Sequence, residues 1–221
     1  HRCCRRQRQM CIRDSNNLAS HNTGGILVFD LPDLPQQGGH HIRVFDNKSI
    51  DNDTDNFAPE GNIVGEVPRG TGIIIMANSD VEIFNNLMSG NGTVNLSIVS
   101  YGDETDDPNY YPHPKNIQVH GNTYGPSGFD PDIDTGDLAK ALFEISGGNM
   151  PDIFWDGIVP ISQIIFGQPD DEKLIIAEKD ATFLTIKPIK YMLGFSDPVN
   201  TNKNDFKGDI SPLEKITIKT F

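Results

Sequence analysis

The stretch IRVFDN, Ile42–Asn47, recurs twice in this chain, as VEIFNN at Val81–Asn86 and as IQVHGN at Ile117–Asn122. In each copy apolar and polar residues alternate for a few positions, and the copy then ends on Asn. Alternation with a period of two is typical of a strand with one buried face, and Asn is typical of the corner that follows. A strand and a corner that recur along a chain indicate a repeat architecture.

A second Asn follows the first after five residues in several copies, and an apolar segment such as Gly72–Met76 comes next. We therefore predict an all-β fold, a right-handed parallel β-helix (solenoid) with a helix-containing C-terminal cap and an irregular tail. Asn tolerates a left-handed backbone, and its amide can bond to the next Asn of a stack. The asparagines expected to form such a structural ladder are Asn17, Asn47, Asn86 and Asn122.

We expect the coils to occupy residues 16–125 and the C-terminal cap and extension to occupy 126–221. Apolar residues at helical spacing predict a helix over 137–146, followed by the stop signal Gly147-Gly148. Short strands are expected over 173–176 and 181–186. The helix is expected to cover the open end of the last coil, because unpaired strand edges invite aggregation.

Residues 1–15 differ from the rest of the chain, because they contain five Arg and all three Cys. Gln9–Ser15 resembles translated sequencing adapter, so the segment is predicted to be non-native and is left out of the fold argument. The alternative is a basic, disordered arm. On the first interpretation the chain is truncated at its N-terminus.

The net charge of −13 disfavours nucleic acid as a partner, because nucleic-acid binding needs clustered Lys and Arg. No apolar run in the sequence is long enough to predict a transmembrane segment. Sequence signatures of catalysis, such as a Gly-x-Ser-x-Gly elbow, a His-Glu-x-x-His motif or a phosphate-binding Gly loop, do not occur.

Parallel strands in register place matching residues side by side. The apolar positions Ile42/Val44, Val81/Ile83 and Ile117/Val119 are expected to face the core. The residues between them, Arg43, Glu82 and Gln118, are expected to form a solvated outer row. An exposed Arg43–Glu82 pair would contribute at most a few tenths of a kcal/mol.

Insertions between the two main strands of a coil carry the candidate site. The middle copy has only Ala77–Asp80 at this point, whereas its neighbours have the long loops 30–40 and 102–115. Loops at equivalent positions leave a repeat protein at the same edge, so these two are expected to wall a shallow cleft. The candidate binding residues are Asp30, Asp33, His40, His41, Asp103, Glu104, Asp106, Asp107, Tyr110, Tyr111 and His113.

Two interpretations of these loops stay open. Acidic residues at alternating positions are suitable oxygen ligands for Ca²⁺, and tyrosines can stack on a sugar ring. The alternative is that acidic loops of this kind are soluble turns. No cofactor other than Ca²⁺ is suggested, and the six His do not form a ligand motif.

Residues 16–221 resemble a family of bacterial exported parallel β-helix domain proteins. The resemblance is carried by Gly24–Pro32 (GGILVFDLP), Arg43–Ser49, Asn56–Val64, Trp155–Gly157 and Ala181–Leu184. It implies an extracytoplasmic protein (periplasmic, lipoprotein-anchored or secreted), with further coils ahead of this chain. It also implies an exported partner that resembles a haem-binding protein, and it supplies no catalytic residues.

Two functions follow as hypotheses. The first is an extracytoplasmic binding or scaffold protein that presents its loop edge to a protein partner or a glycan. The second is a polysaccharide lyase, epimerase or hydrolase that acts in the cleft between the loops. The second hypothesis requires acidic groups that converge across the cleft, one of them with a raised pKa.

Overall fold

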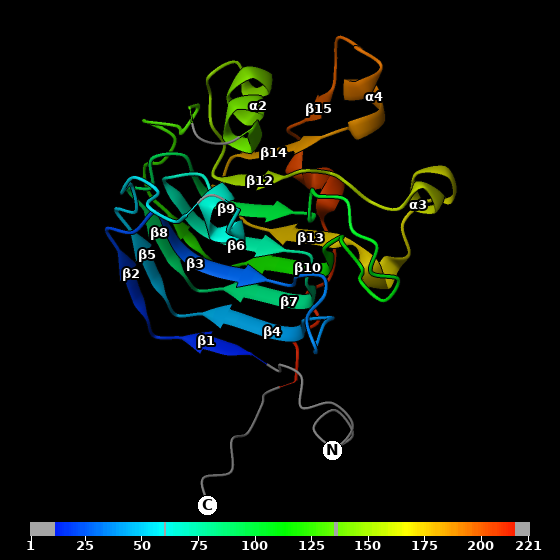
Figure 1. Cartoon of the computed structure of the whole chain (residues 1–221), viewed down its shortest axis with the longest axis horizontal. Helices are drawn as coiled ribbons and strands as arrows, with labels where there is room; N and C mark the ends of the chain where they lie inside the picture. Colours follow the sequence, from blue (N-terminus) through cyan, green and yellow to red (C-terminus); the bar gives the residue numbers. More distant parts are fainter. Residues whose placement is uncertain (1–11, 60, 135–136, 215–221) are drawn as a thin grey trace, which may run out of the picture.

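Three β-sheets form the core of the fold (Figure 1). The computed structural model describes residues 12–59, 61–134 and 137–214. Sheet A contains, in spatial order, β1 (Arg13–Ser15), β4 (His40–Phe45), β7 (Ser79–Phe84), β10 (Lys115–His120) and β13 (Leu174–Ala177). Sheet B contains β11 (Thr123–Tyr124), β8 (Leu87–Ser89), β5 (Lys48–Ile50) and β2 (Leu18–Ser20). Sheet C contains β15 (Val199–Asn200), β14 (Phe183–Ile186), β12 (Ile153–Trp155), β9 (Val94–Val99), β6 (Thr71–Met76) and β3 (Gly24–Phe29).

Helical segments lie mainly in the C-terminal part of the chain. The α-helices are α2 (Asp137–Ser146), α3 (Ile161–Phe166) and α4 (Pro188–Met192). The 3-10 helices are η1 (Ile63–Glu66), η2 (Asp170–Glu172) and η3 (Lys203–Phe206). The bounds of α2 confirm the helix predicted over 137–146.

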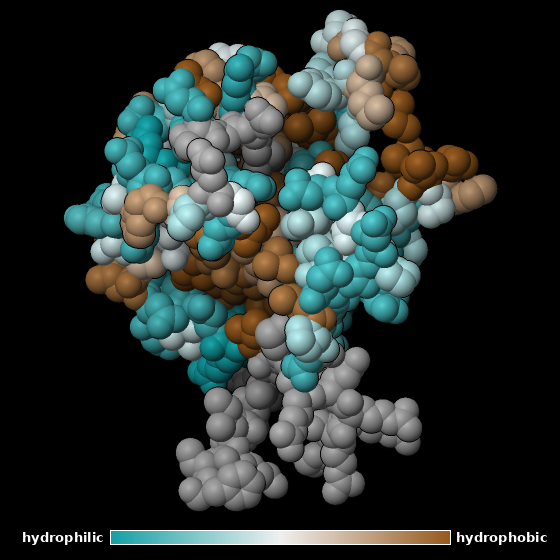
Figure 2. Space-filling view, viewed as in Figure 1, coloured by the Kyte–Doolittle hydropathy of each residue, from teal (hydrophilic) through white to brown (hydrophobic). Residues whose placement is uncertain are grey.

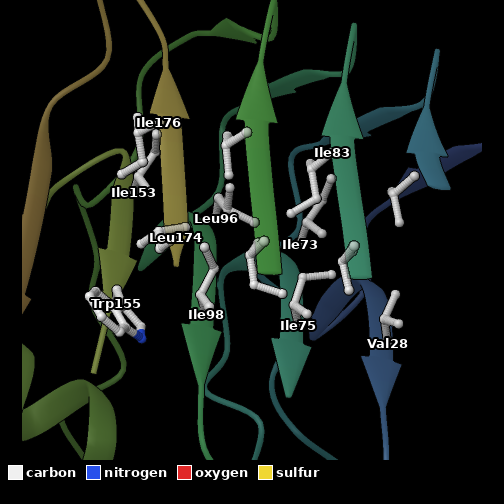
Figure 3. Packing of buried hydrophobic residues seen from close by; sticks show 14 of the residues in the cluster. Val28, Ile73, Ile75, Ile83, Leu96, Ile98, Ile153, Trp155, Leu174 and Ile176 are labelled. Carbon is white, nitrogen blue, oxygen red and sulfur yellow. The ribbon is translucent and has the colours of Figure 1, made fainter. Parts of the chain in front are cut away.

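Successive strands from β1 to β13 pass from one sheet to the next, so each sheet takes every third strand. Ile42 lies beside Val81 and Val81 lies beside Ile117, which confirms the predicted register. These three side chains are at most 2% exposed. Side chains of sheets A and C point toward one another in the interior (Figure 3). Burying each aliphatic side chain contributes roughly 1.5–3 kcal/mol.

The predicted fold class, an all-β right-handed parallel β-helix, is wrong. Sheets A and B are parallel, but sheet C is mixed, because β15 runs antiparallel to β14. Each sheet is open, with an edge strand at either side, and three α-helices lie within the described ranges. The prediction failed because the repeated stretch describes only the sequence before residue 125. The later helices and the β14–β15 turn follow no repeat.

The N-terminal segment that was set apart at 1–15 includes part of the fold. Arg13–Ser15 forms β1, which pairs in parallel with β4. Arg43 N also donates to Ile12 O at 2.9 Å. The predicted boundary after residue 15 is therefore too late, whereas residues 1–11 lie outside the described part of the chain.

Asparagine side chains connect the corners that follow the sheet A strands. Asn17 Nδ2 donates to Asn47 Oδ1 at 3.1 Å, and Asn47 N donates to Asn86 Oδ1 at 3.1 Å. Asn86 Nδ2 donates to Asn122 Oδ1 at 3.0 Å. Glu178 ends this ladder, because its Oε1 accepts from Asn122 Nδ2 at 2.7 Å. The ladder thus supplies partners to polar groups that the corners bury.

The outer face of sheet A is covered, which corrects the predicted solvated row. Arg43 Nε lies 2.8 Å from Glu82 Oε2, and the Glu82 side chain is 2% exposed. Gln118 Oε1 accepts from Ser211 N at 2.8 Å, and Leu213 N donates to Glu82 Oε2 at 3.3 Å. The C-terminal segment therefore lies across this face, 93 to 131 residues away in sequence from its partners.

Sheet C is apolar on both faces. In β6, Ile73 and Ile75 face the interior, and Ile74 and Met76 belong to a second apolar cluster on the outer face. Leu142 of α2 packs in this second cluster. The helix was expected to cover the open end of the last coil. In the structure it packs on the outer face of sheet C, and one edge strand of that sheet is β15.

Candidate functional site

Two long loops join sheet C to sheet A, residues 30–39 between β3 and β4 and residues 100–114 between β9 and β10. The loops contact each other directly. Asp107 Oδ2 accepts from Asp33 N at 3.0 Å and also from the side chain of Gln37. The predicted cleft is thereby reduced to a shallow, open hollow of about 550 Å³ between the loops.

Asp30 and Tyr110 lie beneath these loops and face inward. Asp30 is 2% exposed, and its Oδ2 accepts from Gly38 N at 2.9 Å. Tyr110 OH donates to Asp30 O at 2.7 Å, and the Tyr110 ring lies edge-on to Tyr101 with 5.5 Å between ring centroids. Tyr110 therefore fixes the two loops to each other and offers no ring face to a sugar.

The two adjacent histidines have separate partners. His40 Nδ1 lies 2.6 Å from Gly38 O, within its own loop. His41 Nδ1 lies 3.6 Å from Asp80 Oδ2, on the neighbouring strand β7. The two rings lie edge-on to each other, with 4.9 Å between their centroids.

The distal end of the second loop is also engaged in contacts. His113 Nδ1 lies 3.1 Å from Ser100 Oγ. Lys115 Nζ lies 4.8 Å from the centroid of the Tyr111 ring, so a cation already occupies one face of that ring. Glu104 and Asp106 are exposed. Asp103 is the one acidic residue of this group that borders a larger groove, described below.

The carboxyl groups of Asp30 and Asp107 do not form an acid–base pair for carbohydrate chemistry. Such a pair needs one raised pKa and access to the substrate for both groups. Bonds from Gln37, Asn109 and Asp33 hold the pKa of the partly exposed Asp107 below its ordinary value. Burial raises the pKa of Asp30, but the same burial removes its side chain from the surface.

No group of three or more His, Cys, Asp or Glu side chains within 12–59, 61–134 and 137–214 is placed to hold a metal ion. In the same ranges, no helix combines the length and the apolar character needed to cross a bilayer.

A groove of about 830 Å³ lies on the outer face of sheet C; we call it the sheet C groove. Its floor is apolar and comes from side chains of the sheet, among them Phe29, Met76 and Val99. One wall is η1 with the residues that follow it, and another is formed by residues 101–103 and α4. Figure 2 shows apolar surface in the centre of this face, surrounded by hydrophilic atoms.

Asp156 is the buried carboxyl group of the sheet C groove. It follows β12 and is 5% exposed. Its Oδ2 accepts from Ser100 N at 2.6 Å, and its Oδ1 accepts from Ile158 N at 3.0 Å. Burial raises the pKa of Asp156 to about 6, against the opposing effect of these two backbone N–H groups.

Ser100, His113 and Asp156 lie together but are not arranged as a catalytic triad. In a triad the histidine lies between the serine and the carboxylate. Here Ser100 lies between, because its hydroxyl contacts His113 and its backbone N–H donates to Asp156. Burial lowers the pKa of His113, which favours the neutral ring. The trio fixes the start of the 100–114 loop against the segment after β12.

The sequence carried one signal for the sheet C groove that the loop-based prediction did not use. Ile73–Met76 is a continuous apolar run, whereas a strand with one solvated face alternates. Such a run indicates a strand with both faces covered, and this is how β6 lies in the structure. The position of Asp156 had no such signal, because β12 reaches sheet C only through long-range pairing with β9.

The chain matches no family model, no curated protein and no solved structure. The resemblance to exported β-helix proteins accordingly stays a prediction.

Proposed function

We propose that the chain is a binding protein whose ligand lies in the sheet C groove. This proposal rests on the volume of the sheet C groove together with the residues that line it. A volume of about 830 Å³ is in the range of small-molecule sites, which are mostly apolar with a few placed polar groups. The groove has an apolar floor, and its polar groups gather around Ser100, Asp103 and Asp156.

Part of the second long loop, which was expected to bind a ligand, also takes part in this site. Residues 101–103, at the start of the second long loop, form a wall of the sheet C groove, and Tyr101 also packs in the apolar cluster beneath it. The hollow between Asp33 and Asp107 is smaller and more open, and its polar groups are bonded to each other. A glycan-processing function has less support, because Asp30 and Asp107 do not act as a pair.

The proposal is tested with the neutral fluorescent probe N-phenyl-1-naphthylamine. Titration of the folded chain is expected to give saturable binding at one site. Gly102 lines the groove, and a Cβ added there meets no atom within 4 Å, so Gly102→Trp can fill the groove without a backbone clash. This variant is expected to weaken probe binding by about tenfold or more.

Ala177→Trp provides the matched control, because Ala177 is exposed on β13 of sheet A. The apolar side chains that α3 exposes, such as Ile161 and Phe166, form a second surface for an apolar probe, and both variants leave this surface unchanged. Binding that is equally strong in the Gly102→Trp variant, or that does not saturate, would contradict the proposal.

A further inference from the structure

The ionisable groups that line the sheet C groove are acidic or phenolic. The carboxyl groups belong to Glu66, Asp103 and Asp156, and the phenols to Tyr101 and Tyr191. Lys, Arg and His are absent from its lining. A ligand in the sheet C groove therefore meets negative potential wherever it meets charge.

Two carboxyl groups of the groove, those of Glu66 and Asp103, act on the hydroxyl of Tyr101, which lines the same groove. Burial raises the pKa of Tyr101, and the charges of Asp103, Glu66 and Asp33 raise it further. Glu66 belongs to η1 and Asp33 to the 30–39 loop, so residues far apart in sequence act on the same hydroxyl. Glu66 and Asp103 are exposed and are reached from solvent, whereas the apolar floor lies below them.

Basic groups near the groove are already paired. Lys187 and Lys190, at the start of α4, lie 3.3 Å and 3.1 Å from carboxylate oxygens of Asp197. Arg69 follows the wall residue Pro68, and its guanidinium lies 2.6 Å from Asp53 and 3.0 Å from Asp130. These cations do not line the groove, so its carboxylates leave a negative charge for a ligand to balance.

We propose that the sheet C groove selects ligands that combine an apolar body with a cationic end, such as an alkyl or aryl amine. This inference rests on the proposed binding function and adds the class of ligand. The apolar body lies on the floor formed by Met76 and Val99, and the cation lies between Glu66 and Asp103. Tyr101 lines the same groove, and an aromatic ring face attracts a cation.

The test is displacement of N-phenyl-1-naphthylamine by twelve-carbon competitors below their micellar concentrations. The competitors are dodecyltrimethylammonium, dodecyl sulfate and the neutral dodecyl maltoside. The cation is expected to displace the probe at a concentration about tenfold or more below that needed for the anion, as expected for one partly screened charge pair. Added salt is expected to reduce this preference.

The variant Glu66→Gln/Asp103→Asn keeps the size and shape of both side chains and removes their charges. It is expected to bind the neutral probe as the wild type does and to lose most of the preference for the cation. Asp180→Asn/Asp209→Asn is the matched control, because it removes two exposed carboxylates that do not line the groove. This control is expected to keep the preference.

The outcomes separate this inference from the proposed function. If the probe binds and Gly102→Trp blocks it, but the cation and the anion compete equally, the ligand class is wrong and the binding function stands. An equal loss of preference in both charge variants would also overturn the inference, because net charge alone would explain it. If the probe does not bind, both proposals fail.

Discussion

At the corners after β1, β4, β7 and β10, one residue turns the backbone and the next one bonds to the neighbouring corner. The residues with positive φ are Asn16 (61°), Asp46 (56°), Asn85 (56°) and Gly121 (64°). Each directly precedes a ladder asparagine. Asn, Asp and Gly adopt this left-handed region more easily than other residues. The left-handed turn that the sequence assigned to the ladder asparagines therefore belongs to their predecessors.

Truncation of a ladder residue tests its contribution to stability. In Asn86→Ala, Val44 O and Asn122 Oδ1 lose the donors of the Asn86 amide, and Asn47 N loses its acceptor. Because Asn86 is 1% exposed, we expect the free energy of unfolding to fall by about 2–4 kcal/mol. Urea denaturation measures this change. An equal effect of Asn149→Ala, which removes an exposed side chain, would contradict the assignment.

Asp156 gives the chain a specific dependence of stability on pH. Its pKa is about 6 in the folded protein against an ordinary value of 3.8, so folding favours the protonated form. The resulting stabilisation is complete below about pH 4 and is lost as the pH rises through about 6, and it amounts to about 3 kcal/mol.

Replacement of this carboxyl group removes the titration. We expect the stability of the wild type relative to Asp156→Asn to decrease as the pH rises from 4 to 7, when both are measured by urea denaturation at each pH. Asp180→Asn, which changes an exposed carboxylate, is expected to follow the wild type. A parallel pH profile for Asp156→Asn and the wild type would show that Asp156 is not the titrating group.

Elements that are far apart in the chain contact each other in the structure. Local sequence patterns do not predict such contacts. The register Ile42, Val81, Ile117 followed from alternation, because a strand with one buried face has few other solutions. Alternation also placed Arg43 and Glu82 on the outer side of sheet A. It did not show that the C-terminal segment would bury them, since nothing in the sequence near Ser211 matches a strand or helix.

The contact between the C-terminal segment and sheet A can be weakened at one residue. Gln118→Ala removes the side-chain bonds to Ser211 N and Ser211 O. We expect stability to fall by about 1–2 kcal/mol, and the amide of Ser211 to exchange its hydrogen at least about tenfold faster. Hydrogen exchange measures the stability of the fold, from its slowest amides, and the exchange of the Ser211 amide in the same experiment. Lys207→Ala, an exposed change in the same segment, is expected to leave this exchange unaltered.

For the whole molecule, the strands and their pairing could be predicted from the sequence before about residue 125 but not after it. Before it, the repeated stretch sets strand positions, the inward residues and the order of the sheets. After it, β12, β13 and β14 extend sheets C and A through pairing that depends on long-range contacts, and β15 reverses direction. The sheet C groove combines both parts, with Met76 from the repeat and Asp156 from the later segment. A site of this kind has no local sequence signature.

The C-terminal segment that covers sheet A is synthesised later than the strands that it covers. Glu82 and Leu213 are 131 residues apart, and they are joined by a bond from Leu213 N to Glu82 Oε2. A chain that is synthesised at about 5–20 residues per second makes Leu213 roughly 7–26 seconds after Glu82. Throughout that interval the outer carboxylate of β7 is hydrated, although in the finished protein it is one of the most deeply covered charges. A segment that is made later thus completes a face whose strands were made long before.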